Sequence, residues 1–174
     1  DAIVPAPKAR LTREDKQELR KYIYPLQTVE PGEEGTNDLD VLKELIGEST
    51  VVALGENSHG SSEIYKMKDR LIRYMAKYLG FDIFSIEADM PSAYQLNMFT
   101  QQGKNSSKQL IYNMGMWVWD TEEMLSLVNW MKDFNLSGRK ITYTGFDMQN
   151  INGSVEHLTI AFKDDKQSSQ LLGG

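Results

Sequence analysis

The chain has 174 residues, no cysteine and a net charge of -6, from 25 acidic against 19 basic residues. This length suits one domain with a buried core, and the lack of cysteine excludes disulfides, thiolate metal ligands and cysteine nucleophiles. The acidic balance argues against a nucleic-acid partner, and no apolar run approaches the roughly 18 to 20 residues that cross a bilayer. We expect a soluble protein without a membrane partner, with the cytoplasm slightly favoured as its compartment.

The first 36 residues are expected to lie outside the domain. The opening DAIVPAPKAR has no initiator Met and is typical of a trimmed or processed chain. Thr12 and Asp15 have the spacing of a capping box, which predicts a mostly polar helix that ends before Pro25. The turn-rich PGEEGTND follows, so we assign residues 1–36 to an extension with one helix and residues 37–174 to an α/β domain.

The domain begins with alternating helices and strands. A helix is predicted over 38–46, ended by Gly47, and the apolar run TVVAL at 50–54 then predicts a parallel strand buried on both faces. The strongest helical pattern covers 61–79 and ends at Gly80, directly before a second strand, FDIFSIEA. Strand, helix and strand form a βαβ unit, in which the two strands are parallel.

The second half continues the alternation. Pro91 suits the first turn of a helix, Asp120 with Glu123 predicts the start of another, and KITYTGFD at 140–147 predicts a third strand. Together the elements indicate a three-layer α/β domain with a largely parallel sheet flanked by helices.

Each predicted strand runs into an acidic residue: Glu56, Glu87 and Asp147. Because the carboxyl ends of parallel strands meet at one edge of the sheet, where open α/β sheets build their sites, we expect these carboxylates there. His59 follows the first strand closely and is placed at the same edge. A carboxylate on one imidazole nitrogen fixes the tautomer and leaves the other nitrogen to take a proton from water, which is a general-base arrangement.

Lys68 is expected to point inward from the long helix. The apolar stripe of this helix consists of Ile64, Met67, Leu71, Met75, Tyr78 and Leu79. Lys68 falls inside the stripe, whereas the other charges fall on the opposite side: Lys66, Asp69, Arg70, Arg73 and Lys77. A buried ammonium without a partner is costly, so Lys68 is expected to meet a carboxylate near the sheet edge.

Other residues near these positions are candidates for substrate contacts, namely Asn57, Glu63, Trp117, Trp119 and Asp147. For the tryptophans, core packing is the favoured alternative to a pocket for a bulky apolar ligand. Each carboxylate alone is also explained as a helix cap or loop charge, His59 as a hydrogen-bonded loop residue, and Lys68 as a side chain whose charged end reaches water.

A metal site remains a minority alternative, because Glu56 and His59 with Glu63 or Glu87 supply suitable zinc ligands. The glycines around Glu56-x-x-His59 argue against the continuous helix of a di-iron site. Neither standard glycine-rich phosphate loop is present. We therefore expect neither a metal nor any other cofactor.

The stretch VVALGENSHGSSEIYKMKDRLIRYMAKYLGFDIFSIEADMP resembles the signature region of the erythromycin esterase family, and TYTGFDMQN is similar to a later strand of that family. The resemblance runs from residue 38 to about residue 152. It implies an α/β fold, metal-independent hydrolysis of a lactone ester in macrolide antibiotics, and a role in antibiotic resistance. It also implies that His59 is the general base, that Glu56 and Glu87 are site carboxylates, and that Lys68 is the basic residue on the helix.

Members of that family are longer and carry a further histidine-containing segment downstream. The chain therefore resembles the amino-terminal part of a member, incomplete at its C-terminus. Two other functions stay open at this point. One is a non-catalytic domain that binds a small molecule, and the other is a metal-dependent hydrolase that uses the same carboxylates.

Overall fold

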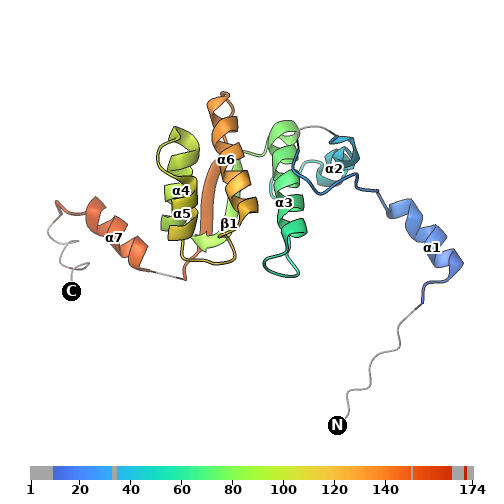
Figure 1. The fold of residues 1–174 in the computed structure, drawn as a ribbon, viewed down its shortest axis with the longest axis horizontal. Helices are drawn as coiled ribbons and strands as arrows, with labels where there is room; N and C mark the ends of the chain where they lie inside the picture. Colours follow the sequence, from blue (N-terminus) through green and yellow to red (C-terminus); the bar gives the residue numbers. More distant parts are fainter. Residues whose placement is uncertain (1–9, 33–34, 150, 166–170, 172–174) are drawn as a thin grey trace, which may run out of the picture.

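The computed structural model describes residues 10–32, 35–149, 151–165 and 171. The helices and strands are, in chain order, α1 Arg13–Leu19, α2 Val41–Ile46, α3 Ser62–Tyr74, β1 Ile83–Asp89, α4 Met90–Gln102, α5 Ser107–Asn113, α6 Glu122–Leu136, β2 Thr142–Asp147 and α7 Asn152–Ala161. Short 3-10 turns cover Arg20–Tyr22 and Asn37–Leu39, and a π-helical turn, Met75–Leu79, extends α3. Helices α1 and α7 lie at opposite ends of the molecule (Figure 1).

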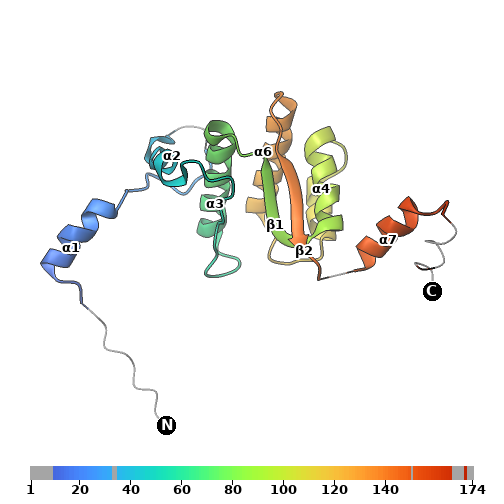
Figure 2. The ribbon, with the colours of Figure 1, turned by 180° about the vertical axis from the view of Figure 1, so that it is seen from behind.

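Two strands form the sheet. β1 and β2 pair in parallel, with Ile83 opposite Thr142 and Ile86 opposite Gly145. The expected parallel direction of these two strands is confirmed, but the predicted βαβ unit is not formed, because β1 pairs with β2 and not with residues 50–54. Helices α4, α5 and α6 lie on the same side of the strands (Figures 1 and 2). The mixed helical and parallel-strand character is as expected, but the three-layer arrangement is only partly seen.

The register between the strands changes near their carboxyl ends. After Ile86 opposite Gly145, the next pair is Asp89 opposite Asp147, so β1 carries one more residue than β2 over this stretch. Gly145 is required at this point because a Cβ there would lie only 2.1 Å from the carbonyl oxygen of Ala88. As a result, Asp147 lies opposite Asp89, one residue farther along β1 than an unbroken register would place it.

The predicted first strand is not formed. Residues 51–56 have no strand structure, and Val51 is 82% exposed. No backbone hydrogen bond joins residues 51–54 to another described residue. Only alternate residues of the run, Val52 and Leu54, pack against the core, whereas Val51 and Ala53 are exposed. The expectation of a strand buried on both faces was wrong, because a cavity separates the run from β1.

Several helix boundaries follow from local chemistry. The Thr12 and Asp15 capping box is present at the start of α1, and Gly80 ends the extension of α3 with a φ of 77°. Pro91 lies in the first turn of α4, as predicted. The start of α6 differs by one residue, because Thr121, not Asp120, accepts the hydrogen bond of the Met124 N–H.

The buried face of α3 differs from the predicted stripe. Asp69 and Arg70, expected on the solvent side, are each only 2% exposed. Arg70 donates to both carboxylate oxygens of Asp38 at 2.9 and 2.6 Å, and also to the carbonyl oxygens of Thr28 and Gly35. The helix is therefore covered on this side by Thr28, Gly35 and Asp38, which apolar periodicity within the helix cannot reveal.

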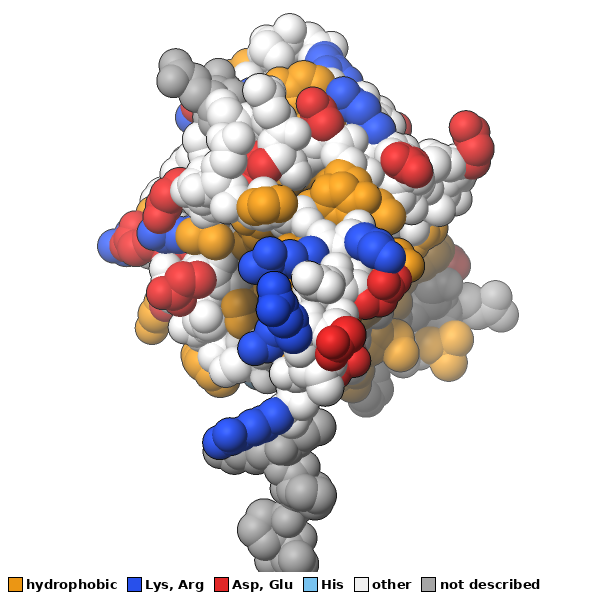
Figure 3. Space-filling view, turned by 90° about the vertical axis from the view of Figure 1, so that its right-hand side faces the viewer, with side chains coloured by type: hydrophobic (Ala, Val, Ile, Leu, Met, Phe, Trp, Pro, Cys, Tyr) orange, Lys and Arg blue, Asp and Glu red, His pale blue; other side chains and the backbone are white. Residues whose placement is uncertain are grey.

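Charges of both signs lie beside one another on the face at the α1 end of the molecule (Figure 3). Within the described part of the chain, no helix combines the length and apolar character needed to cross a membrane.

The Asp38–Arg70 pair generates a stability prediction. Its buried hydrogen bonds hold the pKa of Asp38 at about 2, below the ordinary 3.8. This stabilisation is therefore complete above the unfolded-state pKa and is lost as the pH falls from about 4 through about 2. We expect Asp38→Asn to lower the free energy of unfolding at pH 7 by about 3 kcal/mol, because Arg70 keeps its buried charge but loses its partner.

Urea unfolding of both proteins between pH 2 and pH 7 measures this effect. The difference between wild type and variant is expected to shrink at the acidic end. Glu18→Gln is the control, because Glu18 pairs with Lys21 on the surface and both side chains are more than half exposed. Equal losses of unfolding free energy in the two variants would show that the buried pair contributes no more to stability than a surface ion pair.

Candidate active site

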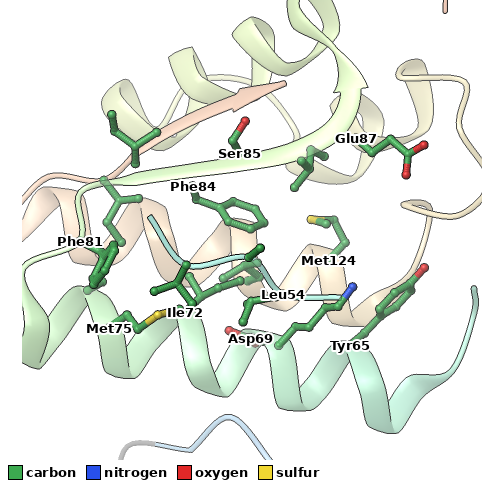
Figure 4. A pocket seen from close by; sticks show the side chains of 18 of the residues that line it. Leu54, Tyr65, Asp69, Ile72, Met75, Phe81, Phe84, Ser85, Glu87 and Met124 are labelled. Carbon is green, nitrogen blue, oxygen red and sulfur yellow. The ribbon is translucent and has the colours of Figure 1, made fainter. Parts of the chain in front are cut away.

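The site is the polar end of a long cavity. The cavity has a volume of about 740 Å³ and lies between residues 50–54, α3, β1 and α6. Figure 4 shows its apolar body, with Leu54, Ile72 and Phe84 around the space between β1 and α3. At one end it is bordered by Glu56, His59, Lys68 and Glu87. All four residues that the sequence placed at one edge thus line the same cavity, and three of them, Glu56, His59 and Lys68, are joined by hydrogen bonds.

Glu56 is the centre of this polar end. One carboxylate oxygen, Oε1, lies 2.6 Å from Nδ1 of His59, and the other, Oε2, accepts a hydrogen bond from the ammonium group of Lys68. A carboxylate can only accept, so Nδ1 of neutral His59 carries the proton. Nε2 is then the nitrogen with a free lone pair. The side chain of His59 is 53% exposed, so water reaches this nitrogen.

The charges of the cluster are set by burial and by pairing. The side chains of Glu56 and Lys68 are only 12% and 18% exposed. Burial by itself would raise the pKa of Glu56, but the hydrogen bonds of Lys68 and His59 and their charges hold this pKa below its ordinary value. Glu56 is therefore a stable anion at neutral pH. The predicted inward position of Lys68 and its pairing with a carboxylate are both present.

Tyr65 ties the loop of Glu56 and His59 to the opposite wall. Its hydroxyl lies 3.0 Å from the carbonyl oxygen of Val118 and 3.3 Å from Oε1 of Glu56, and it accepts the N–H of Gly60 at 3.4 Å. Burial raises the pKa of this hydroxyl, which stays protonated and available as a donor. Tyr65 therefore holds the loop in place.

Glu87 approaches the cluster from the end of β1. Its side chain is exposed and makes no hydrogen bond or ion pair with a described residue, whereas its carbonyl oxygen accepts the indole N–H of Trp119 at 3.0 Å. Figure 4 shows the carboxylate of Glu87 pointing away from the apolar body of the cavity. This carboxylate is free to meet a ligand or water at the open end.

The two tryptophans occupy different positions. Trp119 is 8% exposed, lines the cavity and lies near the ring of Tyr65, with 6.0 Å between centroids. Trp117 is 71% exposed and meets His59 edge-on at 6.2 Å. Trp117 therefore presents an open apolar surface beside the histidine, and Trp119 packs in the wall.

The structure does not bring the other predicted contacts into the cavity. Asn57 and Glu63 are exposed and do not line it, and Glu63 accepts a hydrogen bond from Ser61 at 3.3 Å. Asp147 does not line it either. The change of register beyond Ile86 places Asp147 farther along, where it accepts the backbone N–H of Met148 and the side-chain amide of Gln149.

Sequence reasoning missed two residues of the site. Tyr65 lies three positions before Lys68 on α3, and this spacing on one helix face was the available signal. Glu123, expected only at the start of α6, lines the cavity and accepts a hydrogen bond from Ser62. No local pattern links Ser62 to Glu123, because 61 residues separate them.

Among the described residues, no three His, Asp or Glu side chains converge in a way that would hold a metal ion. A histidine held by a buried carboxylate at the edge of an α/β sheet is instead suited to proton transfer from water, as in hydrolases that use general-base catalysis.

Comparison with known proteins identifies the family. The model of the erythromycin esterase family matches residues 76–171, and the chain belongs to this family. It is 34% identical over 130 residues to YbfO of Bacillus subtilis (strain 168), a candidate hydrolase, and 29% identical over 119 residues to erythromycin esterase type II of Escherichia coli. These matches cover 74% and 68% of the chain but only 28% of each relative.

Two solved structures share the fold. One is a succinoglycan biosynthesis protein, with a TM-score of 0.76 and 32% identity over 94% of the chain and 42% of that protein. The other is a protein of Bacillus cereus, with a TM-score of 0.78 and 30% identity over 95% of the chain and 40% of that protein. The chain thus corresponds to less than half of each solved relative.

The charge arrangement of the site generates a prediction. Lys68→Met removes the ammonium group that opposes the effect of burial on Glu56. We therefore expect the pKa of Glu56 to rise in this variant, as followed by NMR of the carboxyl carbon during a pH titration. Lys66→Met is the control, because Lys66 pairs with Glu30 at 2.9 Å and not with Glu56. An unchanged pKa in Lys68→Met would show that the ion pair does not set the charge of Glu56.

Proposed function

We propose that the protein hydrolyses an ester or macrolactone with water activated by His59, without a required metal. The observation that carries this proposal is the 2.6 Å contact between Nδ1 of His59 and the buried carboxylate of Glu56. This contact fixes the tautomer in which Nε2 is the free base, and the exposed histidine gives that nitrogen access to water.

The reaction follows from these groups. Nε2 of His59 takes a proton from water while the water oxygen attacks the ester carbonyl carbon, which gives a tetrahedral oxyanion. The carbonyl re-forms as the ester C–O bond breaks, and the imidazolium returns its proton to the leaving alkoxide. The products are a carboxylic acid and an alcohol. Glu56 stabilises the imidazolium that forms in between, as the carboxylate of a catalytic triad does.

The other polar groups have supporting roles in the proposal. Lys68 keeps Glu56 ionised and oriented, and Tyr65 holds the loop that carries His59. The exposed carboxylate of Glu87 accepts hydrogen bonds from substrate hydroxyls or positions the water. Trp117, beside His59, offers an apolar surface to the ring of a bulky lactone.

A macrolide is the proposed substrate. The support is the family match and the name of the Escherichia coli relative, erythromycin esterase type II. Resistance to macrolide antibiotics would be the consequence of this activity. The matched part is only 28% of that relative. The macrolide substrate is therefore proposed for this chain and is not carried over from the relative.

Mass spectrometry of a macrolide and of a panel of simpler esters, incubated with the protein, tests this function. We expect the substrate to gain one water, and we expect His59→Gln to lower kcat/KM by about 10² to 10⁴ because the general base is lost. His157→Gln is the matched control, since His157 lies on α7 against Tyr94 and outside the cavity. A chelator is expected to leave the rate unchanged.

Each contrary result identifies a different function. Loss of activity with chelator and recovery with added metal would favour a metal-dependent hydrolase on the same carboxylates. Binding of a macrolide with equal affinity by wild type and His59→Gln, without turnover of any ester by either, would favour a non-catalytic binding domain. Hydrolysis of simple esters alone would remove only the macrolide assignment.

A further inference from the structure

The apolar body of the cavity has the shape of a missing strand. One wall is the extended run from Thr50 to Leu54, and the other is β1 from Ile83 to Glu87. Both walls run toward the polar cluster at the same end. Side chains of α3 and α6 border the space between them, among them Ile72, Met75, Met124 and Leu127. We call the space between the two walls the slot (Figure 4).

The wall formed by β1 has a free hydrogen-bonding edge. The carbonyl oxygen of Asp82 accepts the N–H of Thr142 at 2.8 Å, so the backbone of residues 82, 84 and 86 faces β2. Alternate residues of a strand bond neighbours on opposite sides, and the N–H and C=O groups of Ile83 and Ser85 therefore face the slot. At Glu87 this edge ends, because the carbonyl oxygen accepts the indole N–H of Trp119.

The opposite wall also lacks partners. The backbone of Val51–Leu54 makes no hydrogen bond with any other described residue. Apolar extended segments in cores normally have their backbone groups paired, because an unpaired buried N–H or C=O costs free energy. The two walls face each other across an apolar space, and both have unpaired backbone groups. One added strand between them would pair the N–H and C=O groups of both.

The volume of the slot agrees with this occupant. A five-residue strand, at about 3.3 Å per residue, about 4.8 Å from its neighbours and about 10 Å through the layer, fills about 800 Å³. The whole cavity, with its polar end included, has about 740 Å³, so the slot has the size of a short strand. The exposed fraction of 65% at Ile83 is also explained, because this apolar side chain lies at the uncovered edge of the strand.

We propose that the slot binds an extended apolar strand, which completes a sheet from residues 51–54 through the added strand to β1 and β2. The source we assign is polypeptide that corresponds to the part of the solved relatives outside the match. These relatives share the fold over 94% and 95% of this chain, yet more than half of each of them lies outside the matched region. Adding a strand to a free sheet edge is a common way to bind a peptide.

A strand in the slot limits where a substrate binds in the cavity. The strand fills the apolar body, so the ligand is confined to the open end where His59 and Trp117 lie. The inference does not depend on the proposed hydrolysis, because it rests on backbone pairing in the slot and not on the polar cluster.

Amide hydrogen exchange tests the proposal. The protein is measured alone and with each of a set of overlapping peptides of about 15 residues, long enough for a typical strand of about 5 to 6 residues. The peptides span the region of the Bacillus cereus relative outside the match. We expect at least one peptide, at millimolar concentration, to slow exchange of the amides of residues 51–54, Ile83 and Ser85 by tenfold or more.

Two matched variants locate the effect. Ile83→Asp places a charge on the slot edge, and Leu45→Asp places one on α2, outside the slot. The two side chains are 65% and 68% exposed, so both variants are expected to fold alike, as circular dichroism will show. The slowing of amide exchange by the peptide is expected to be at least tenfold smaller in Ile83→Asp than in the wild type. In Leu45→Asp it is expected to equal that of the wild type.

Three results would overturn the proposal. The first is that no peptide protects these amides. The second is that they are already protected in the protein alone, together with dimer formation in light scattering, which would assign the slot to a second copy of the chain. The third is protection of the same amides by a macrolide, which would assign the slot to a small ligand.

Discussion

The carboxylate of Glu56 is the interaction on which the site depends. It joins a loop that has no regular structure to the long helix α3, because one oxygen holds His59 and the other holds Lys68. Burial disfavours its charge, and the hydrogen bonds and charges of both partners more than offset this effect, so the pKa of Glu56 stays below its ordinary value. The same atoms thus fix the loop, orient the imidazole and set the charge of the site.

Two further polar contacts support this centre from opposite sides. The hydroxyl of Tyr65 joins the loop to Val118, and Arg70 holds Thr28, Gly35 and Asp38 against the back of α3. The helix therefore carries polar groups on two faces, one toward the site and one toward the N-terminal segment. Its apolar residues alone do not describe how it packs, which is why the periodic stripe misplaced Asp69 and Arg70.

The cavity connects the site to the proposed strand position. Its polar end contains the proposed catalytic groups, and its apolar end has the dimensions and the unpaired backbone groups of a strand position. The family match and the likeness to solved structures show that the chain shares this architecture with proteins more than twice as long. An exposed sheet edge of this kind is a place where another strand adds.

The sequence by itself determined the local features: the helix starts and ends at Thr12, Gly80 and Pro91, the parallel strands, and the grouping of His59 and Lys68 with carboxylates. These follow from backbone preferences, periodicity and the cost of an unpaired charge, which act over a few residues. Only the tertiary structure decided which carboxylate Lys68 meets, that Asp147 lies outside the cavity, and that residues 50–54 do not pair with β1. These depend on register and on contacts between distant segments, for which the local sequence carries no signal.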